Sequence, residues 1–371
     1  MSEFSATDGV HMARALRLAK RGQYTAHPNP MVGCVLVRDG VVVGEGWHQH
    51  AGEAHAEINA LRAAGDNARG ATAYVTLEPC AHHGKTPPCV DALIQAGIAA
   101  VCAAMQDPFS EVGGRGLAAL VDAGIGVRHG LMRAAAEELN AGFLSRVVRK
   151  RPFVRLKMAS SLDGGVAMAD GQSQWITGPE ARADTQRLRA RSGAIMTGIG
   201  TVVADDPLLT VRDPELDTGG CQPLRAVLDS HLRMPLSAGM LALPGTTLIY
   251  CIDPQRQQPL TDTGAEVVVI DAVEQHVDVS AVLRDLADRQ INDVLVEAGP
   301  AVAGRMIENQ LIDELVIYLA PHIMGSQTKR MFQTPTWSAL ADRQDLLVCD
   351  VCRIGADTRI TARPSERSNS P

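Results

Sequence analysis

The sequence predicts an α/β protein of two domains. At 371 residues the chain is too long for one ordinary hydrophobic core. Apolar runs with the period of strands alternate with stretches of helical period in both halves. A basic helix end, Arg149-Lys150-Arg151, is followed by Pro152, after which the alternation starts again. We therefore expect one domain over residues 1–150, a second over 151–363, and a disordered tail over 364–371.

Cap, turn and periodicity signals delimit the elements of the first half. Asp8 can cap a first helix, and Asp39-Gly40 between two apolar runs indicates a β-hairpin. Ile58 and Leu61 are expected to point into the core from the helix that begins at His55. The expected helices are Gly9–Arg21, His55–Ala64, Cys89–Ala96, Leu117–Ala123 and Met132–Val148, and the expected strands are Met31–Arg38, Val41–Gly46, Ala73–Leu77 and Ile98–Met105.

The second half carries its own succession of strands and helices. A turn at Asp163-Gly164-Gly165 follows its first strand, and Thr177-Gly178-Pro179 begins its first helix. The expected strands are Phe153–Met158, Ala194–Thr197, Arg225–Leu228, Thr247–Tyr250, Glu266–Ile270 and Asp293–Glu297, and the expected helices are Glu180–Arg191, Ser280–Arg289 and Ala301–Glu308. Three further strands, expected to form an antiparallel edge, lie near Leu315–Leu319, Leu346–Arg353 and Thr358–Thr361.

The composition narrows the class of protein and of partner. Apolar residues make up 46% and charged residues 21%, which is typical of a globular protein. The net charge of −7, without blocks of like charge, disfavours a nucleic-acid partner such as duplex DNA or tRNA. The acidic start Met1–Ser5 is unlike a signal peptide, and no apolar run reaches the ~18–20 residues that cross a bilayer. We expect a cytoplasmic protein without membrane partners, whose eight cysteines are thiols or metal ligands.

One His, one Glu and two Cys stand in an order that suits a catalytic metal. The chain reads His55-Ala56-Glu57, then Pro79-Cys80 and, after eight further residues, Cys89. An imidazole nitrogen and two thiolates are ligands that Zn²⁺ binds tetrahedrally, and three protein ligands leave one position for water. Glu57 lies too far round a helix from His55 to share its ligand direction, so it is left to act on that water. We expect one Zn²⁺ per chain, held by His55, Cys80 and Cys89.

Each of these residues taken alone has a simpler interpretation. A single His at the start of a helix is usually a cap or a surface residue. Isolated cysteines in apolar stretches are usually small core residues, which is what we expect of Cys34, Cys102, Cys221 and Cys251. Cys349 and Cys352 lie in an apparent strand without a His nearby and are expected to be structural. The joint order with Glu57 and Pro79 is what favours a metal site at His55, Cys80 and Cys89.

That order resembles the signature of zinc-dependent nucleobase deaminases. In such sites Zn²⁺ lowers the pKa of a bound water from about 15.7 to about 7. Glu57 would take a proton from the water and pass it to a ring nitrogen and then to the leaving ammonia. The resemblance therefore implies hydrolytic deamination of an amino-substituted ring.

The loop from Pro79 to Cys89 is longer than the Pro-Cys-x-x-Cys of most cytidine deaminases. It resembles the loop of the bifunctional deaminase/reductase family of riboflavin biosynthesis. The resemblance extends over Asn29-Pro30-Met31-Val32-Gly33-Cys34, Gly46-Trp47-His48 and Gly52-Glu53-Ala54-His55-Ala56-Glu57. It implies a cytidine-deaminase-like α/β/α fold for the first domain and a pyrimidine substrate contacted by Asn29, His48, His82 and Lys85. Lys85 could meet a phosphate; the alternative for these residues is a mobile polar loop.

Stretches of the second half resemble the reductase domain of the same family: Lys157–Gly164, Ser173–Thr177, Gly198–Arg212 and Glu297–Pro300. This resemblance implies a dihydrofolate-reductase-like α/β fold and NADPH as cofactor. From the residues alone, Gly299 to Gly304 links a strand to a helix, where backbone N–H groups can hold a phosphate. The stretch matches neither the Walker lysine pattern nor Gly-x-Gly-x-x-Gly. No residue can be assigned to a 2′-phosphate, so NADPH rather than NADH rests on the resemblance.

The resemblance also implies individual contacts in the second domain. The NADPH contacts would be Ala159, Trp175, Thr201, Asp205, Gly299, Pro300, Ala301, Val302, Ala303, Gly304 and Arg305, with Ser230 as a further candidate. The substrate contacts would be Ser173, Arg189, Leu209, Arg212 and Glu297. Arg189 and Arg212 suit a phosphate, since guanidinium groups clamp it bidentately, although an Arg on a helix is otherwise usually solvated. Lys157 could orient the sugar or could be a strand-end lysine that reaches solvent.

As a whole, the resemblance implies a homodimeric enzyme with two consecutive activities. It would deaminate 2,5-diamino-6-(5-phosphoribosylamino)pyrimidin-4(3H)-one and then reduce the ribosyl group to give 5-amino-6-(5-phosphoribitylamino)uracil. One alternative is a nucleic-acid-editing zinc deaminase with an appended binding domain, against which the acidic composition and the long cysteine loop argue. Another is a non-catalytic protein with structural zinc. Glu57, which is unnecessary for holding zinc, argues against it.

Overall fold

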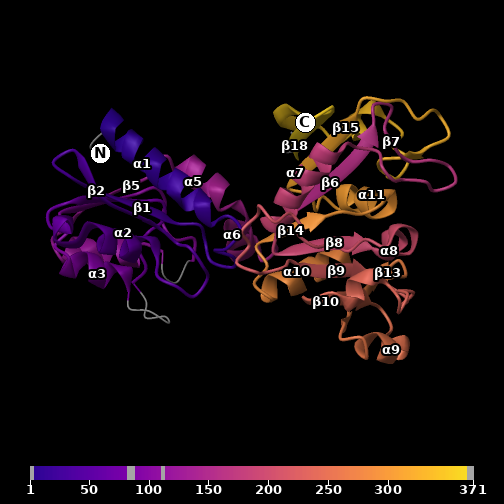
Figure 1. The fold of residues 1–371 in the computed structure, drawn as a ribbon, viewed down its shortest axis with the longest axis horizontal. Helices are drawn as coiled ribbons and strands as arrows, with labels where there is room; N and C mark the ends of the chain where they lie inside the picture. The colour runs from indigo at the N-terminus through magenta and orange to yellow at the C-terminus, as the bar shows by residue number, and fades with distance from the viewer. Residues whose placement is uncertain (1–3, 82–87, 110–112, 366–371) are drawn as a thin grey trace. The chain divides into compact units, whose positions relative to one another are not determined.

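The computed structural model describes residues 4–81, 88–109 and 113–365. By its internal contacts the chain divides into two compact units, Met1–Lys150 (unit 1) and Arg151–Pro371 (unit 2) (Figure 1). Each unit has its own sheet and its own hydrophobic core. The predicted α/β class is confirmed. The described part of the chain contains no helix that could span a lipid bilayer.

In its described residues, unit 1 is a five-stranded sheet with helices on both faces (Figure 1). Its strands are β1 (Gly33–Arg38), β2 (Val41–Trp47), β3 (Thr72–Val75), β4 (Ala100–Ala103) and β5 (Gly126–His129). Its α-helices are α1 (Ala6–Ala19), α2 (Ala56–Ala64), α3 (Cys89–Gln95), α4 (Arg115–Asp122), α5 (Arg133–Leu139) and α6 (Ala141–Leu144). The strand order is β2-β1-β3-β4-β5, in which β1 is antiparallel to both neighbours and β3, β4 and β5 are parallel.

Helix α2 packs closely on the sheet, which positions the residue just before it. Its buried face is made of alanines, Ala56, Ala60 and Ala64. Gly46 of β2 permits the close approach, because a Cβ there would lie 2.4 Å from the carbonyl oxygen of Ala56. Ile58 and Leu61, predicted to point inward, are only partly buried, because small side chains fill the contact with the strand. The start of α2 is thereby held against β2.

The predicted hairpin is confirmed, whereas two helix predictions in unit 1 are corrected. Asp39 and Gly40 both have positive φ, 53° and 76°, as the tight turn between β1 and β2 requires. Ser5, not Asp8, is the N-cap of α1, and Asp8 completes the capping box as its third helical residue. The long helix predicted over Met132–Val148 is interrupted at Asn140, whose side-chain amide donates to the carbonyl oxygen of Met31 and accepts from its N–H. Strand β5 was not predicted.

Unit 2 is built on a larger sheet. Its strands are β6 (Phe153–Ser161), β7 (Gly165–Ala167), β8 (Ala194–Gly198), β9 (Leu224–Leu228), β10 (Thr247–Cys251), β11 (Glu266–Val269), β12 (Ala272–Val273), β13 (His276–Val277), β14 (Asp293–Val296), β15 (Glu314–Ala320), β16 (Lys329–Arg330), β17 (Leu346–Ile354) and β18 (Asp357–Pro364). Its α-helices are α7 (Pro179–Ala190), α8 (Ile199–Asp205), α9 (Gln258–Thr261), α10 (Val279–Asp288) and α11 (Pro300–Glu308).

The main sheet of unit 2 has nine strands in the described residues, in the order β11-β10-β9-β8-β14-β6-β15-β18-β17. The strands from β11 to β15 are parallel, and β18 and β17 continue the sheet antiparallel, which confirms the predicted antiparallel edge. Pro364 still belongs to β18, so the ordered chain extends into the predicted tail, and residues 366–371 lie outside the described part. The carboxyl ends of parallel strands meet at one edge, where α/β proteins usually bind ligands.

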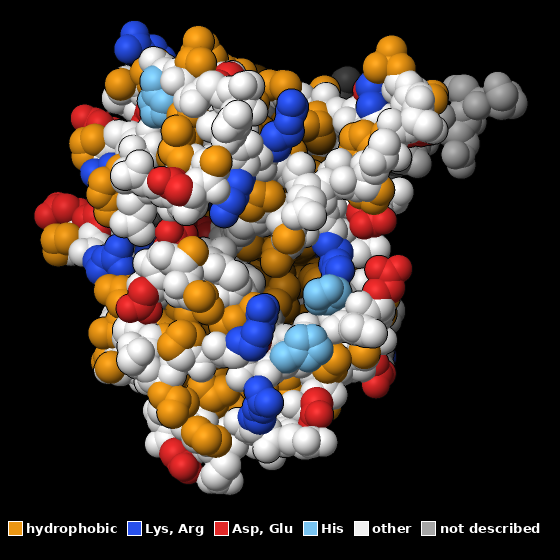
Figure 2. Space-filling view, turned by 90° about the vertical axis from the view of Figure 1, so that its right-hand side faces the viewer, with side chains coloured by type: hydrophobic (Ala, Val, Ile, Leu, Met, Phe, Trp, Pro, Cys, Tyr) orange, Lys and Arg blue, Asp and Glu red, His pale blue; other side chains and the backbone are white. Residues whose placement is uncertain are grey.

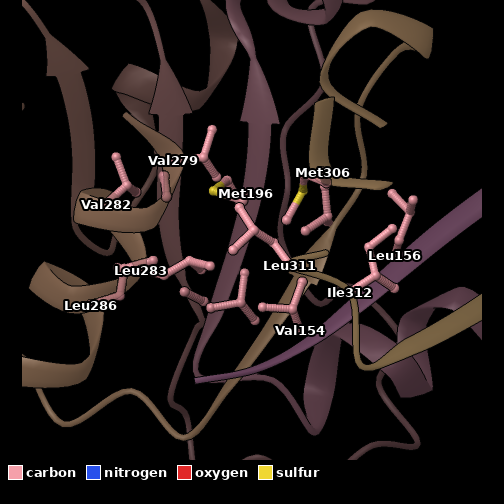
Figure 3. Close-up of a cluster of buried hydrophobic side chains, with 14 of the residues drawn as sticks. Val154, Leu156, Met196, Val279, Val282, Leu283, Leu286, Met306, Leu311 and Ile312 are labelled. Atoms are coloured by element: carbon pink, nitrogen blue, oxygen red, sulfur yellow. The ribbon is translucent and has the colours of Figure 1, made fainter. Parts of the chain in front are cut away.

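Apolar side chains from strands and helices form the core of unit 2. Figure 3 shows the cluster between β6, β8, α10 and the chain that follows α11, with Val154, Leu156, Met196, Val282, Leu283, Leu286, Leu311 and Ile312 directed toward one another. A second cluster, which includes Ile199 and Val202 of α8, packs with residues of β8, β9 and β10. The first cluster includes residues of β6, which carries Lys157 and Ala159, and of β14, which ends just before Glu297.

Candidate active sites

The three predicted metal ligands converge in unit 1. His55 is the N-cap residue of α2, Cys89 is the first residue of α3, and Cys80 lies in the irregular chain after β3. His55 Nδ1 lies 3.2 Å from Cys89 Sγ and 3.5 Å from Cys80 Sγ. All three possible ligand atoms lie within 4.8 Å of one another, the one such group of ligands found among the described residues.

These distances fit a tetrahedral zinc ion. Zn–N bonds of ~2.0–2.1 Å and Zn–S bonds of ~2.3 Å place neighbouring ligands of a tetrahedron roughly 3.3–3.8 Å apart. The separations of His55 Nδ1 from the two sulfurs lie within or just short of that range. One nitrogen and two sulfurs also form a donor set that zinc prefers, with one coordination position left over.

The pKa values of the two cysteines in the cluster are shifted in opposite directions. Hydrogen bonding from the Cys89 thiol and from His55 lowers the pKa of Cys80 to about 4, although burial opposes the shift. The backbone N–H of Cys89 also donates to Cys80 Sγ, at 3.3 Å. The contact with Cys80, together with burial, raises the pKa of Cys89. A thiolate is the form of cysteine that binds a metal, so the folded chain already favours it at Cys80.

Glu57 lies beside the three ligands without belonging to them. It is the second residue of α2 and its side chain is buried. Burial raises the pKa of Glu57 to about 7, against the opposing effects of its own backbone N–H and His55. A buried carboxyl group next to a metal position is able to accept and return a proton.

Two of the four predicted pyrimidine contacts are brought together next to His55. Asn29 Nδ2 lies 3.0 Å from His48 Nε2, and His48 Nδ1 lies 3.2 Å from the carbonyl oxygen of Ala54. A carbonyl only accepts, so Nδ1 donates and Nε2 of a neutral His48 accepts from Asn29. Burial lowers the pKa of His48, which favours this neutral form. His82 and Lys85 lie outside the described residues.

In unit 2 the predicted substrate residues form a charged cluster. The Nε and Nη2 of Arg189 donate to the carboxylate of Glu297 at 2.6 and 3.0 Å, and Nη1 donates to the carbonyl oxygen of Thr210 at 3.0 Å. The Nε and Nη2 groups of Arg189, which could have bound a phosphate bidentately, are therefore occupied by Glu297. Arg212 donates to the hydroxyl of Thr210 at 3.3 Å. Burial, together with Arg189, lowers the pKa of Lys157.

A second group of predicted residues gathers around the end of β8 and the start of α11. Ser173 donates to the carboxylate of Asp205 at 2.7 Å, which links a predicted substrate contact to a predicted cofactor contact. A Cβ on Gly299 would lie 3.7 Å from the hydroxyl oxygen of Thr201. Trp175 is 70% exposed, and the guanidinium of Arg182 lies 4.6 Å from its ring centre. Ala159 lies on β6, which β14 separates from β8 in the sheet.

Most of the predicted NADPH-binding stretch Gly299–Arg305 is helical, since α11 begins one residue before the predicted start at Ala301. Gly299 is the N-cap of α11 and Pro300 its first residue, so the stretch is already helical from Pro300. Ala303 is buried in the hydrophobic core. A Cβ on Gly304 would lie 2.0 Å from the carbonyl oxygen of Gln333, which makes this glycine a packing residue. Backbone N–H groups able to face a phosphate are thus those at the start of the helix, at Ala301 and Val302.

Two other predicted contacts have structural partners. The Leu209 side chain is buried in the cluster that contains Ile199 and Val202, so a ligand could meet only its backbone. The hydroxyl of Ser230 accepts from the N–H of Val277 at 3.1 Å, which joins the end of β9 to β13.

Figure 2 views unit 2 from the side toward which β8 points in Figure 1. This face is hollowed, with apolar side chains inside and Lys, Arg and His side chains around the rim.

Sequence reasoning missed Glu78, which directly precedes Pro79-Cys80. Its carboxylate is buried and accepts hydrogen bonds from four backbone N–H groups. The signal that could have identified Glu78 is an acidic residue placed directly between Val75–Leu77 and Pro79-Cys80. The segment Pro79-Cys80, which carries one of the predicted ligands, is called the metal segment below.

Of the cysteines predicted to be core residues, Cys34, Cys102 and Cys251 are buried but Cys221 is exposed, because it lies in a turn.

Comparison with known proteins assigns the family. The model of the RibD C-terminal domain matches residues 152–358, and that of the cytidine and deoxycytidylate deaminase zinc-binding region matches residues 5–105. The riboflavin biosynthesis protein RibD of Escherichia coli is 49% identical over 94% of this chain and 97% of its own length. The chain belongs to the RibD family. RibD of Haemophilus influenzae is 44% identical over 98% of this chain and 99% of its own length.

Solved structures agree with this membership. RibD of Acinetobacter baumannii matches with a TM-score of 0.91 and 44% identity, over 97% of this chain and 99% of that one. The Thermotoga maritima diaminohydroxyphosphoribosylaminopyrimidine deaminase/5-amino-6-(5-phosphoribosylamino)uracil reductase matches with a TM-score of 0.87 and 33% identity, over the same shares. As a RibD protein, the chain is a bifunctional enzyme of riboflavin biosynthesis, a deaminase and a reductase. This confirms the predicted family and sets aside both alternatives.

Proposed function

We propose that unit 1 deaminates 2,5-diamino-6-(5-phosphoribosylamino)pyrimidin-4(3H)-one and that unit 2 reduces the ribosyl group of the product to a ribityl chain. In the first reaction water replaces the ring amine and ammonia leaves. In the second, one hydride and one proton are added across the opened sugar carbonyl. The observation that carries the proposal is the convergence of His55, Cys80 and Cys89 beside a carboxylate that is not one of the ligands.

His55, Cys80 and Cys89 would hold one Zn²⁺ in unit 1. The metal would supply Lewis acidity that makes a water molecule nucleophilic at neutral pH. Glu57, buried beside Cys89, would remove a proton from that water and return it to the ring nitrogen and to the departing amine. Metal binding and proton transfer are thus assigned to separate side chains, as hydrolytic deamination requires.

Asn29 and His48 would recognise the pyrimidine ring through hydrogen bonds. Because the Asn29 amide nitrogen is engaged by His48, its carbonyl oxygen would accept from a ring N–H. The bond of His48 to Ala54 in turn holds the ring of His48 in place. His82 and Lys85 remain proposed contacts, with Lys85 meeting the phosphate of the substrate.

The reductase substrate would bind at the charged cluster of unit 2. Lys157, Arg189 and Arg212 carry three positive charges against the single carboxylate of Glu297. This surplus favours a phosphate dianion, which Arg212 would bind while Arg189 stays paired with Glu297. Lys157 would orient the sugar, and Ser173 and the backbone of Leu209 would complete the contacts.

A nicotinamide cofactor would lie across the carboxyl ends of β6, β8, β9 and β14. It would supply the hydride for C1 of the sugar. The proposed contacts are Ala159, Trp175, Thr201, Asp205, Ser230 and the residues from Gly299 to Arg305. The first turn of α11 would face the pyrophosphate, because its N–H groups and the helix dipole favour an anion.

A basic cluster near Ser230 supports NADPH over NADH. Burial, and then the charges of Arg305, His231 and Arg233, lower the pKa of His276, so these four side chains share one electrostatic neighbourhood, with Glu274 opposing them. The bond between Ser230 and Val277 places this cluster beside the end of β9. His231, Arg233 and His276 are exposed. A 2′-phosphate on the adenosine would be bound here by charge-assisted hydrogen bonds.

Replacing Arg233 by Gln should weaken binding of 2′,5′-ADP by about tenfold, the value of one charge-assisted hydrogen bond, and leave binding of 5′-ADP unchanged. Isothermal titration calorimetry measures both affinities without turnover. Arg343→Gln, at an exposed arginine near the opposite edge strand β17, is the matched control and should change neither. Equal loss of both affinities in Arg233→Gln would contradict a 2′-phosphate site.

We further propose a cytoplasmic homodimer that forms through β17. This edge strand exposes a row of large apolar side chains, Leu346, Leu347, Val348 and Val351. Soluble proteins usually protect such an edge, and an exposed apolar patch marks an interaction surface. A second copy of the chain would cover it. Sedimentation equilibrium should give twice the mass of one chain, and a monomer at micromolar concentration would contradict the proposal.

Removal of zinc tests the deaminase assignment. Exhaustive chelation should abolish ammonia release from the diaminopyrimidine substrate, and one equivalent of Zn²⁺ per chain should restore it. NADPH oxidation with 5-amino-6-(5-phosphoribosylamino)uracil should be unaffected, because none of the proposed ligands lies in unit 2. Ammonia release that survives complete loss of metal would overturn the proposal for unit 1.

A further inference from the structure

The carboxylate of Glu78 is the centre of a compact hydrogen-bonded structure next to the metal segment. Its Oε2 accepts from the N–H of Asp107 at 3.0 Å and of Gly114 at 2.8 Å. Its Oε1 accepts from the N–H of Gly116 at 2.8 Å and of Leu117 at 3.3 Å. The side chain is 5% exposed. Four backbone donors on a single buried carboxylate satisfy all its principal acceptor positions.

These donors come from two segments that are separate in sequence from Glu78. Asp107 follows β4, and Gly114, Gly116 and Leu117 form the start of α4, where the helix dipole favours a negative charge. The N–H of Glu78 also donates to the carbonyl oxygen of Met105, at 2.9 Å. Glu78 therefore ties the chain after β3 to the chain after β4 and to the first turn of α4.

The same contact extends to Pro79. A Cβ on Gly116 would lie 2.0 Å from the carbonyl oxygen of Pro79, so α4 packs directly on the backbone that leads into Cys80. On its other side the segment is held by α3, because the N–H of Val90 donates to the carbonyl oxygen of Cys80 at 3.3 Å. Residues 78–80 are thus held between two helices.

The three proposed metal ligands differ in what holds them. His55 is the cap of α2 and Cys89 begins α3, so a helix places each of them. Cys80 belongs to neither a helix nor a strand. Its sulfur accepts a hydrogen bond from the N–H of Cys89, and its backbone continues from Glu78 and Pro79, to whose anchoring the Glu78 carboxylate contributes four hydrogen bonds.

We propose that Glu78 is a positioning residue for metal binding, which sets the place of Cys80 by anchoring its backbone to α4 and to the chain after β4. The inference rests on the zinc site proposed above. Glu78 does not itself contact the reacting atoms. Its loss should change metal affinity and metal geometry, and should not only lower the stability of unit 1.

The test is the full-length Glu78→Gln variant. The amide turns one acceptor oxygen into an NH₂ group that faces two backbone N–H donors, so about half of the anchoring bonds are lost. Zinc affinity, measured by competition with a chromophoric chelator, should fall by roughly 10–100-fold, as for other residues that orient metal ligands. The absorption spectrum of the Co²⁺-substituted variant should also change, because it reports the ligand geometry. NADPH oxidation by unit 2 should stay at the wild-type rate.

Asp8→Asn is the matched control. Asp8 is another buried carboxylate of unit 1, bonded to Ser5, Tyr74 and Arg128, and among the described residues none of these bonds reaches residues 78–80. This variant should lose stability and keep the wild-type zinc affinity and Co²⁺ spectrum. If Glu78→Gln behaves in the same way, Glu78 is only a structural residue and the inference is wrong.

Two further measurements keep the test decisive. If Glu78→Gln does not fold, Gly116→Ala retains the carboxylate and displaces α4 from Pro79. It should shift the Co²⁺ spectrum, and an unchanged spectrum would overturn the inference. The wild-type chain is titrated with Zn²⁺ first. Failure to bind there would refute the proposed zinc site itself, whereas wild-type binding with an unaltered Glu78→Gln variant refutes only the role of Glu78.

Discussion

Replacing Glu57 by Gln is expected to reduce ammonia release by about 10²–10⁴-fold, the range that a positioned acid–base residue contributes. The amide has nearly the same volume and fits the same buried site at the start of α2, but it can neither take a proton from water nor return one. Zinc should remain stoichiometric, because Glu57 is not among the three converging ligands. Steady-state ammonia release and elemental analysis of the same preparation measure the two effects together.

The matched control for this variant is Glu137→Gln. Glu137 is an exposed carboxylate of unit 1, on α5, where it pairs with Arg133. It should release ammonia at the wild-type rate. Full activity in Glu57→Gln would remove the carboxylate from the mechanism, and loss of zinc from that variant would reassign Glu57 as a ligand.

The convergence of His55, Cys80 and Cys89 could be predicted because much of what places them is local. His55 and Cys89 each stand at the start of a helix that periodicity reveals, and helix starts converge at the edge of an α/β sheet. Residue type and order then identify the chemistry, since His, Cys and Cys with a nearby Glu have few other uses. The same reasoning predicted the hairpin at Asp39-Gly40, where turn geometry depends on two adjacent residues.

Features that depend on distant partners could not be predicted in this way. Asn140 interrupts a helix because its amide bonds the backbone of Met31, which lies far away in the sequence. Gly304 resembles part of a phosphate-binding loop, yet it is small because the chain at Gln333 packs on it. The place of Glu78 directly before Pro79-Cys80 is a signal in the sequence, but its role could not be predicted, because its four donors come from residues after β4. In each case the tertiary contact, which periodicity does not register, decides the role.

A substitution in the charged cluster of unit 2 is expected to have the largest effect on the free energy of unfolding. Arg189 and Glu297 form a two-point ion pair whose side chains are 10% and 13% exposed, with Lys157 close by. Removing one partner of such a pair leaves an uncompensated charge away from water, which typically costs ~3–5 kcal/mol. Glu297→Met should therefore lower the free energy of unfolding of unit 2 by about that amount, because Arg189 and Lys157 would then face each other without a carboxylate.

The double variant Arg189→Met/Glu297→Met separates stability from function. Replacing both partners by apolar groups removes the uncompensated guanidinium but leaves Lys157 without a carboxylate, so part of the loss should be recovered. NADPH oxidation should be lost in both variants, because the geometry that presents Arg212 to the substrate phosphate and Lys157 to the sugar is gone. Urea unfolding followed by circular dichroism measures the change in stability, and absorbance at 340 nm measures NADPH oxidation.

Glu266→Gln, which breaks a more exposed ion pair with Arg289, is the control and should lower the free energy of unfolding by less than about 1 kcal/mol. If the double variant reduced substrate at the wild-type rate, the pair would be structural and the substrate phosphate would have to bind elsewhere in unit 2.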